Sequence, residues 1–306
     1  MKPAGCPDLF VVGAPRCGTT ALCNWLEKHP RICFSQPKEP HYFSHLVTAG
    51  GDLRRGYLRR FFYHYLPERH AVVGEGSVSY LYSKDAIEQI LALNPDALFV
   101  VHVRNPVELV QSYHARLCYT LEEDEADFAT AWGLQERRAR GERIPRLCRR
   151  AEMLQYAEIG QLGKYLAQLY SVAGSERCLV NVFDDFRRNP RGSYERVLAI
   201  AGLETDGRAR FPRKQSSRTY RRAWLHRALM RPSQGMARVV ESAERSQPGQ
   251  KRLMKRVRKG LLRWNTVERA PLPLSAETVA SLRETFRDDV ALLSELLHRD
   301  LRGWLA

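Results

Sequence analysis

The chain has 306 residues, enough for one large domain with a sizeable core. Its 44% hydrophobic and 27% charged residues exclude a disordered, collagenous or disulfide-knotted chain. The net charge of +15 comes from residues 207–269, where 19 Lys and Arg stand against three Asp and Glu. The remainder, with 30 basic and 31 acidic residues, is nearly neutral. Any nucleic-acid or membrane function based on net charge would therefore belong to that one segment.

No run approaches the roughly 20 apolar residues of a membrane span, and the N-terminus lacks the pattern of a signal peptide. We therefore expect a cytoplasmic protein. The seven cysteines are odd in number and show no CxxC spacing. Reduced thiols and no metal site are the expectation from this pattern.

Short apolar runs alternate with helical patterns in the first two thirds of the chain. Each expected strand is a continuous apolar run, as a strand buried on both faces requires. Strands are expected at 9–12, 71–74, 97–103 and 177–183. Helices are expected at 19–28, 84–93, 106–117, 122–140, 155–171 and 192–201, with a turn at 184–190. The alternation predicts an α/β fold, a P-loop-type parallel sheet flanked by helices.

The basic segment reads differently, as an Arg-rich helical segment near the C-terminus. Helices are expected at about 221–245 and 251–264, and Trp224 and Trp264 are expected to anchor them. An amphipathic helix follows at 275–297. No repeat or low-complexity tract interrupts the chain, so a single domain is expected over residues 1–306.

The first functional signal is the run Gly13-Ala-Pro-Arg16-Cys17-Gly18-Thr19-Thr20, which follows one expected strand and opens the next helix. Backbone N–H groups at such a turn face an anion, so the run predicts a phosphate-binding loop. Thr19 stands where a Walker loop has its lysine, which disfavours ATP or GTP hydrolysis and weakens a P-loop kinase interpretation. Cys17 suggests a nucleophile, but a small residue packed within the loop is the favoured interpretation.

Two further groups of polar residues are candidates for binding or catalysis. Arg104, Asn105 and Pro106 end the strand at 97–103, and Ser112 follows about two helical turns later. Ligands bind outside the carboxyl ends of parallel strands, so Arg104 is expected at the edge that carries the loop. The run Lys38-Glu39-Pro40-His41-Tyr42-Phe43 holds a cation, a carboxylate and an imidazole, groups suited to acid–base work.

Together these three elements resemble the sulfotransferases that use 3′-phosphoadenylyl sulfate (PAPS), and most closely the heparan-sulfate-type and bacterial members. The likeness covers nearly the whole chain, although the basic segment matches only near its start. The resemblance implies transfer of a sulfuryl group from PAPS to a hydroxyl or amine of a glycan, lipid or small molecule, with PAP as the second product. Residues 1–306 would then form one sulfotransferase-like domain, within which 207–269 is a basic cap on the acceptor side.

The resemblance also assigns roles to individual residues. The loop would bind the 5′-phosphosulfate, Arg104 and Ser112 would hold the 3′-phosphate, and a looser match near residues 215–220 would clamp the nucleotide. Glu39 would be the base, with His41 as runner-up, and Arg16 and Lys38 would act as catalytic cations. The expected cofactor-binding residues are Gly13, Arg16, Cys17, Gly18, Thr19, Thr20, Arg104, Ser112, Ser217, Arg218 and Tyr220.

Two departures from the family pattern stand out. Heparan-sulfate members carry a lysine where this chain has Arg16. They also carry a Glu-Lys-Ser/Thr-Pro run, which here reads Glu75-Gly76-Ser77-Val78, so any role of that lysine is absent or filled by Lys38 or His41. The alternative is therefore a catalytically inactive nucleotide- or nucleic-acid-binding protein on the same fold.

The basic segment is expected to attract an anionic acceptor or a membrane surface, or to be an ordinary solvated helical face. No nucleic-acid partner is expected from the leading interpretation.

Overall fold

The computed structural model describes residues 5–46, 53–212, 218–231, 248–268 and 272–306. The chain divides into two compact units. The first comprises Met1–Leu109, Ala157–Lys214 and Ala280–Ala306, and the second comprises Val110–Tyr156 and Gln215–Val279. The expectation of a single sulfotransferase-like domain over 1–306 stays a prediction.

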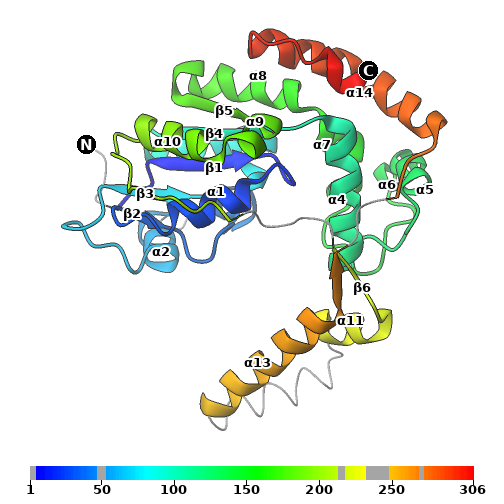
Figure 1. Ribbon diagram of the computed structural model, residues 1–306, viewed down its shortest axis with the longest axis horizontal. Helices are drawn as coiled ribbons and strands as arrows, with labels where there is room; N and C mark the ends of the chain where they lie inside the picture. The colour runs from blue at the N-terminus through cyan, green and yellow to red at the C-terminus, as the bar shows by residue number, and fades with distance from the viewer. Residues whose placement is uncertain (1–4, 47–52, 213–217, 232–247, 269–271) are drawn as a thin grey trace. The chain divides into compact units, whose positions relative to one another are not determined.

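The first unit is built on a parallel sheet in the order β2-β3-β1-β4-β5 (Figure 1). The strands are β1 (Leu9–Gly13), β2 (Ile32–Phe34), β3 (Val72–Glu75), β4 (Leu98–Val103) and β5 (Cys178–Val182). The expected α/β fold with a parallel sheet flanked by helices is therefore confirmed. Since all five strands run the same way, the segments that follow β1, β2, β3 and β4 leave the sheet at one edge.

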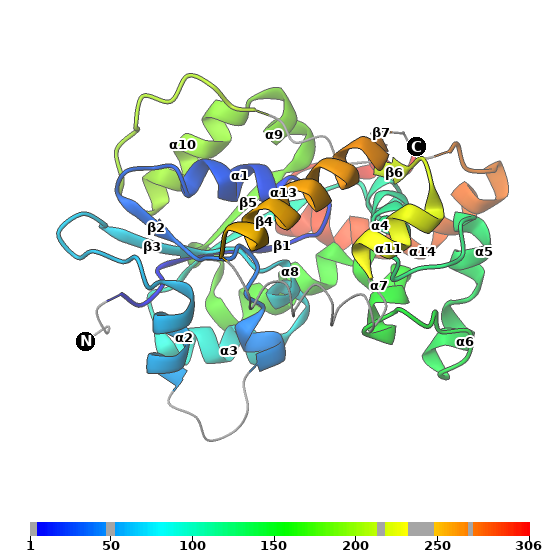
Figure 2. The same cartoon turned by 90° about the horizontal axis from the view of Figure 1, so that it is seen from below.

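Helices cover both faces of this sheet (Figure 2). On one face, α1 (Thr19–Leu26), α9 (Phe183–Arg188) and α10 (Pro190–Ile200) bury a cluster in which Trp25 stacks on Phe186 at 5.2 Å between ring centroids. On the other lie α3 (Lys84–Leu93) and α8 (Leu162–Ala173). The core packing of both faces fixes the strand ends that carry the polar residues.

A carboxylate joins α8 to α14 (Ala276–Leu296) within the first unit. Asp289 accepts hydrogen bonds from the backbone N–H groups of Gly163 and Lys164, at 2.9 and 2.8 Å, at the start of α8. A negative charge at a helix N-terminus satisfies orphan donors and complements the helix dipole. A Cβ at Gly163 would lie 2.4 Å from the Asp289 carbonyl, so glycine permits this close approach.

Several expected elements differ from those observed. The helix expected at 122–140 is wrong: the structure has α5 (Phe128–Gly133) and α6 (Gln135–Ala139), because Asp127 caps a new helix by accepting from Thr130 N at 2.8 Å. The turn expected at 184–190 is also wrong, since most of it is α9. The helix expected at 155–171 is divided into α7 (Tyr156–Gly160) and α8.

The second unit contains most of α4 (Pro106–Thr120), α5, α6 and most of the basic segment. Strands β6 (Arg218–Tyr220) and β7 (Thr266–Glu268) form an antiparallel pair. Strand β6 precedes α11 (Ala223–Met230), and β7 follows α13 (Pro248–Asn265). The pair was not predicted. Of the helix expected at 221–245, α11 is described, and residues 232–245 lie outside the described residues. The remaining elements are α2 (Leu53–Phe61) and the short helices at Tyr42–Leu46, Val78–Tyr82, Ala151–Leu154, Ser175–Arg177 and Arg302–Leu305.

The second unit contains a buried ion pair. Arg138 donates to both carboxylate oxygens of Glu123 at 2.8 Å, and the Tyr156 hydroxyl donates to the same carboxylate. The Arg138 and Glu123 side chains are only 1% and 0% exposed. In the described part of the chain, no helix has the length and hydropathy needed to cross a bilayer.

Candidate functional site

The loop after β1 turns sharply into α1. Gly18 has φ +88°, a left-handed conformation, and a Cβ there would lie 2.8 Å from the Phe186 ring. The first hydrogen bonds of α1 run from Ala21 N and Leu22 N to Gly18 O. The N–H groups of Thr19 and Thr20 therefore precede the helix's own ladder and point out of its N-terminus. That is the arrangement that binds an anion.

Strand β4 holds the carbonyl groups of this loop. His102 Nδ1 donates to Cys17 O at 2.9 Å, and Arg104 Nη1 donates to Arg16 O at 3.2 Å. The C=O and N–H of a trans peptide point in opposite directions. Anchoring these two oxygens to β4 therefore turns the N–H groups of Cys17 and Gly18 away from the strand. Successive N–H groups turned to one side form an anion-binding nest.

His102 is a neutral structural residue in this arrangement. Its Nε2 faces Asn181 Nδ2 at 3.3 Å, so Nδ1 carries the proton that Cys17 O accepts. Burial lowers the pKa of His102 to about 4, against the opposing effect of the hydrogen bond to Cys17. His102 is therefore a buried histidine with both ring nitrogens in contact with a polar group, and it orients the loop.

Cys17 packs inside the loop and does not resemble a nucleophile. Its side chain is fully buried, and Sγ lies 3.3 Å from Pro15 O. Burial raises the pKa of the Cys17 thiol to about 12, more than the positive charge of Arg104 lowers it. A thiol of this kind stays protonated, whereas the nucleophilic form is the thiolate.

Arg104 stands at the end of β4 with a mostly buried side chain. Its guanidinium carbon lies 4.6 Å from the Phe183 ring centroid, a cation–π distance. Nη2 pairs with Glu108 at 2.6 Å, one turn along α4. Asn105 caps this helix by accepting from Val107 N at 2.9 Å, with Pro106 at the first helical position. The guanidinium is thus held rigidly beside the loop.

The segment after β2 brings Lys38, Glu39 and His41 together. Lys38 Nζ donates to Glu39 Oε1, and His41 Nε2 lies 3.7 Å from Glu39 Oε2. Glu39 and His41 have φ +63° and +52°, and Arg16 in the loop has +64°. These left-handed conformations are costly for residues other than glycine and gather at functional sites.

Glu39 is held ionised by its neighbours. Burial raises the pKa of Glu39, but the hydrogen bond with His41 and the charge of Lys38 outweigh it and lower the pKa to about 2. The carboxylate is therefore present at any ordinary pH. Its side chain is 34% exposed, so it lies within reach of a bound molecule.

A hydrogen-bond network that leads to a buried carboxylate fixes the position of His41. His41 N donates to Ser77 Oγ at 3.0 Å, and His41 Nδ1 lies 2.7 Å from Ser79 Oγ. Ser77 Oγ in turn donates to Glu75 at 2.6 Å, and the Tyr57 hydroxyl donates to the same carboxylate. Glu75 is fully buried, and burial raises its pKa despite these hydrogen bonds. Sequence reasoning did not assign this network.

Gly76 lies against the Lys38 side chain. A Cβ at Gly76 would lie 2.6 Å from Cys23 Sγ on α1 and 3.6 Å from Lys38 Cε. Lys38 thus passes close to the point where a side chain at position 76 would begin. Its charge also contributes, after burial, to the lowered pKa of His102. Lys38 therefore connects the Glu39 segment to α1 and β4.

The structure brings together the expected residues of the first unit and leaves the others as predictions. Gly13–Thr20, Arg104, Lys38, Glu39 and His41 gather at one edge of the sheet. Ser112 is buried on α4, in the second unit. Arg218 and Tyr220 lie on β6 of the same unit, and Ser217 lies outside the described residues. Among the residues described, no group of three or more His, Cys, Asp or Glu could hold a metal ion.

A cavity of about 360 Å³ runs beside the edge strand β2. Ile32, Phe34 and Gln36 of the β2 segment form one wall, and the end of α1 and residues 64–70 form the others. Its basic and imidazole lining side chains are Lys28, His29, His64, Arg69 and His70, against one carboxylate, Glu27. No sequence motif signalled this cavity, because its walls come from three separate segments.

The known proteins to which parts of this chain are similar in sequence are sulfotransferases. Residues of the chain align at 28% identity over 109 residues with a membrane-associated sulfotransferase, kil1, of Dictyostelium discoideum, covering 35% of this chain and 22% of that protein. Heparan sulfate glucosamine 3-O-sulfotransferase 6 of Mus musculus is 30% identical over 110 residues, covering 36% of this chain and 30% of its own. The matches thus span less than a third of these relatives. No protein-family model matches the chain.

The fold comparison extends over almost the whole chain. The crystal structure of a sulfotransferase from Alicyclobacillus acidocaldarius superposes with a TM-score of 0.66 and 23% sequence identity, covering 98% of this chain and 99% of that one. At that identity the likeness shows the fold. The chain is therefore similar in sequence to sulfotransferases over about a third of its length, and it has the fold of the bacterial sulfotransferase over almost all of it.

Proposed function

We propose that the protein transfers a sulfuryl group from PAPS to an acceptor hydroxyl or amine. The observation that supports this proposal is that an anion-binding loop and a group of acid–base residues lie at the same edge of the sheet. A loop whose N–H groups are turned outward by His102 and Arg104 binds the donor's anion. A strained Lys38-Glu39-His41 segment beside it supplies a carboxylate and a cation.

In the proposed donor site, the 5′-phosphosulfate lies against the N-terminus of α1. The loop N–H groups, the Thr19 and Thr20 hydroxyls and Arg16 stabilise the charge that develops on the leaving phosphate oxygen. Arg104 binds the 3′-phosphate, in exchange for its ion pair with Glu108. Charge-assisted contacts of Arg to phosphate are among the stronger hydrogen bonds, which suits discrimination between nucleotides.

In the proposed reaction, the acceptor oxygen or nitrogen attacks sulfur in line with the 5′-phosphate. The new bond to sulfur forms as the bond from sulfur to the phosphate oxygen breaks, and PAP leaves. Glu39 takes the acceptor proton. The low pKa of Glu39 makes it a weak base while Lys38 is paired with it, so we assign Lys38 to turn toward the donor's sulfonate, which raises the basicity of Glu39.

Lys38 also lies close to position 76, where this chain has glycine and the family pattern has a lysine. Its Cε lies near the origin of any side chain at Gly76, as described above. We assign to Lys38 the cationic role that the family's second lysine would otherwise fill. His41, held by Ser77 and Ser79, orients Glu39 and remains the second candidate base.

The acceptor is proposed to be anionic. The cavity beside β2 has four apolar lining residues and an excess of basic and imidazole groups. We assign the acceptor to this cavity, whose lining residue Gln36 precedes Glu39 by three residues in the chain. Sulfated or carboxylated saccharides combine an apolar ring face with negative charge and fit this lining.

The proposal is tested by transfer from ³⁵S-labelled PAPS to a panel of acceptors that contains each saccharide in neutral and anionic form. We expect labelled product with at least one anionic acceptor and a smaller yield with its neutral counterpart. Equal yields with both forms would contradict the anionic acceptor alone. Failure of PAP to bind at all would contradict the proposed donor.

Replacing Arg104 by Gln is expected to weaken PAP binding by roughly 10- to 150-fold, the value of a lost hydrogen bond to a charged group. Binding of adenosine 5′-phosphate, which lacks the 3′-phosphate, should weaken less, because it loses only the support that Arg104 gives to the loop through Arg16 O. Glu108→Gln is the matched variant, because it removes the carboxylate that competes with phosphate for Arg104. Calorimetry should show equal or tighter PAP binding for Glu108→Gln, and equal losses for both nucleotides with Arg104→Gln would refute the assignment.

A further inference from the structure

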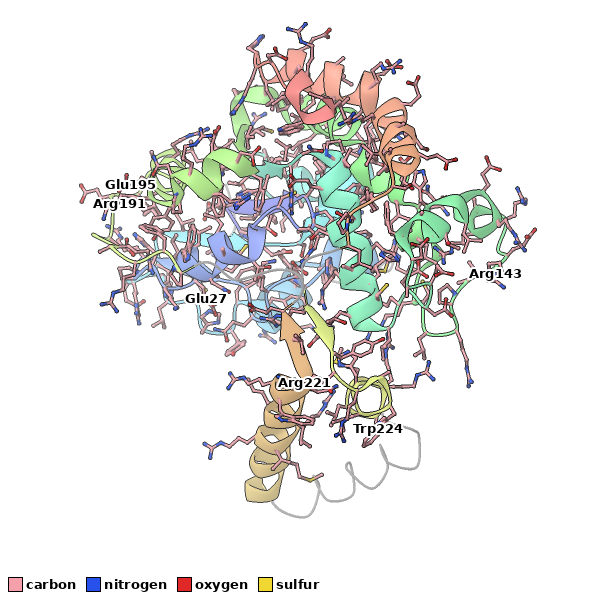
Figure 3. All side chains as sticks on the ribbon, turned by 45° about the vertical axis from the view of Figure 1, so that its right-hand side comes forward. Glu27, Arg143, Arg191, Glu195, Arg221 and Trp224 are labelled. Atoms are coloured by element: carbon pink, nitrogen blue, oxygen red, sulfur yellow. The ribbon has the colours of Figure 1, made fainter. Side chains whose placement is uncertain are left out.

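The part of the basic segment formed by α11 and α13 presents apolar and basic side chains to solvent. Trp224 is 66% exposed, and Val257, Leu261 and Trp264 are 53%, 41% and 52% exposed. The expectation that the two tryptophans anchor their helices is not met, since more than half of each side chain is open to solvent. Figure 3 shows the Arg221 and Trp224 side chains beside α11. We call these four apolar residues the exposed apolar patch.

Within the second unit, hydrogen bonds join α11 to α13. Asn265 is fully buried; its Oδ1 accepts from Arg222 N at 2.9 Å and its Nδ2 donates to Arg222 O at 3.1 Å. Arg258 Nε donates to Leu229 O of α11 at 2.9 Å. Specific hydrogen bonds therefore hold α11 and α13 together. Trp224 and Trp264 are exposed although both helices are fixed in place.

The charge of α13 is of one sign. Over Pro248–Asn265 the sequence has seven Lys and Arg and no Asp or Glu. Val257, Leu261 and Trp264 recur at intervals of four and three residues, which places them along one side of the helix, while Arg256, Lys259 and Arg263 lie on another. Arg221 and Arg222 add charge close to the Trp264 ring, at 6.0 and 5.6 Å.

We infer that this surface docks on an anionic lipid membrane. A helix with a basic polar face and a Trp- and Leu-bearing apolar face lies in the plane of the bilayer interface, where basic residues meet anionic headgroups. Tryptophan concentrates at that interface because its ring is apolar and its N–H is polar. The negative charge of the lipid complements the uniformly positive helix. This inference goes beyond the proposed transfer reaction and does not depend on it.

The test is co-sedimentation of the full chain with vesicles. Phosphatidylcholine vesicles containing about 30% phosphatidylserine should pellet the protein, and pure phosphatidylcholine vesicles should not. The triple variant Arg256→Gln, Lys259→Gln, Arg263→Gln should reduce the partition coefficient roughly 100-fold, at about fivefold per basic residue. The matched control replaces Arg188, Arg287 and Arg302, exposed arginines of the first unit, by Gln and should bind as wild type.

The exposed apolar patch is tested separately. Val257→Ser with Trp264→Ser should reduce binding at least tenfold, since each removes apolar area that would enter the interface. Ile200→Ser, at an exposed apolar position of α10, is the control and should have no effect. Trp224→Phe with Trp264→Phe should abolish fluorescence quenching by brominated lipids while sedimentation persists.

Three results would overturn the inference. Equal binding to neutral and anionic vesicles would remove the electrostatic basis. Self-association that Trp264→Ser abolishes, without vesicle binding, would show that a second copy covers the patch. Displacement from vesicles by duplex DNA at lower concentration than by soluble anionic lipid headgroups would assign the surface to nucleic acid. PAP affinity, measured on the same variants, should remain at the wild-type value whichever of these occurs.

Discussion

Replacing Glu39 by Gln is expected to reduce turnover by about 10²–10⁴-fold, the usual contribution of a positioned general base. Glutamine keeps the shape of the side chain and its hydrogen bond from Lys38 but cannot accept the acceptor's proton. PAP affinity should change little, because in the proposed donor site the loop and Arg104, rather than Glu39, hold the nucleotide. Turnover is measured with labelled PAPS, and PAP affinity by calorimetry.

The matched control is Glu88→Gln on α3, where an exposed carboxylate pairs with Lys84 at 3.5 Å. It should leave both quantities unchanged. Because the pKa of Glu39 is lowered to about 2, its carboxylate form persists at any pH well above 2. Loss of kcat/KM on mild acidification, which reports the free enzyme with Lys38 still paired to Glu39, should therefore come from another group. Equal losses of turnover and PAP affinity in Glu39→Gln would show a structural role, and wild-type turnover would exclude Glu39 as the base.

Replacing Arg138 by Met is expected to lower the free energy of unfolding by about 3–5 kcal/mol, the cost of leaving one partner of a buried ion pair uncompensated. Glu123 would retain the Tyr156 hydroxyl and the backbone N–H groups of Asp124 and Glu125, at 3.0 and 2.9 Å. None of these carries a positive charge. Urea denaturation at neutral pH, compared with wild type, measures the difference.

The pH dependence of this loss has a definite sign. Burial raises the pKa of Glu123, but Arg138 and Tyr156 outweigh it and lower the pKa below the usual value. The wild-type ion pair therefore stabilises the fold above the unfolded pKa of roughly 4.3 and stops doing so as pH falls through the folded value. In Arg138→Met the positive charge that lowers the pKa of Glu123 is lost while burial still raises it, so the difference in stability should shrink as pH falls from the folded pKa of the variant to the lower folded pKa of the wild type.

Arg137→Met supplies the control for Arg138→Met. Arg137 pairs with Glu142 at 3.0 Å, and the two side chains are 51% and 49% exposed. An exposed pair of this kind contributes about 0–1 kcal/mol. A cost for Arg138→Met no larger than for Arg137→Met would refute the expectation that loss of one partner of the buried pair destabilises the fold strongly.

Much of the first unit's fold can be predicted from the sequence, because its central strands are continuous apolar runs. The bounds of α3 are also predicted, since Ser83 caps it by accepting from Ala86 N at 3.2 Å. The edge strand β2 has only three residues, too few for a pattern. The antiparallel pair β6–β7 joins residues 218–220 to 266–268, and nothing local in either run specifies the partner. Glu123 and Arg138 look like solvent-facing charges in sequence, although they form a buried pair.

The candidate site, too, can be predicted from the sequence only in part. The loop motif, Arg104 and the Lys38-Glu39-His41 run are visible as residue patterns. Their connections depend on which strands are neighbours: His102 reaches Cys17 O because β1 pairs with β4, and Lys38 reaches Gly76 because β2 pairs with β3. Strand order is a property of the whole sheet. The support of His41 by Ser77 and Glu75 could not be predicted for the same reason.

The central claim is that the first unit binds the PAPS nucleotide through separate recognition of its two phosphate-bearing ends. Its most direct test is calorimetric titration of the wild-type protein with PAP, adenosine 5′-phosphate and duplex DNA at low and high salt. We predict saturable binding of PAP that tolerates salt, with weaker binding of adenosine 5′-phosphate. Binding of DNA with a steep dependence on salt, together with no preference for PAP over adenosine 5′-phosphate, would contradict the account.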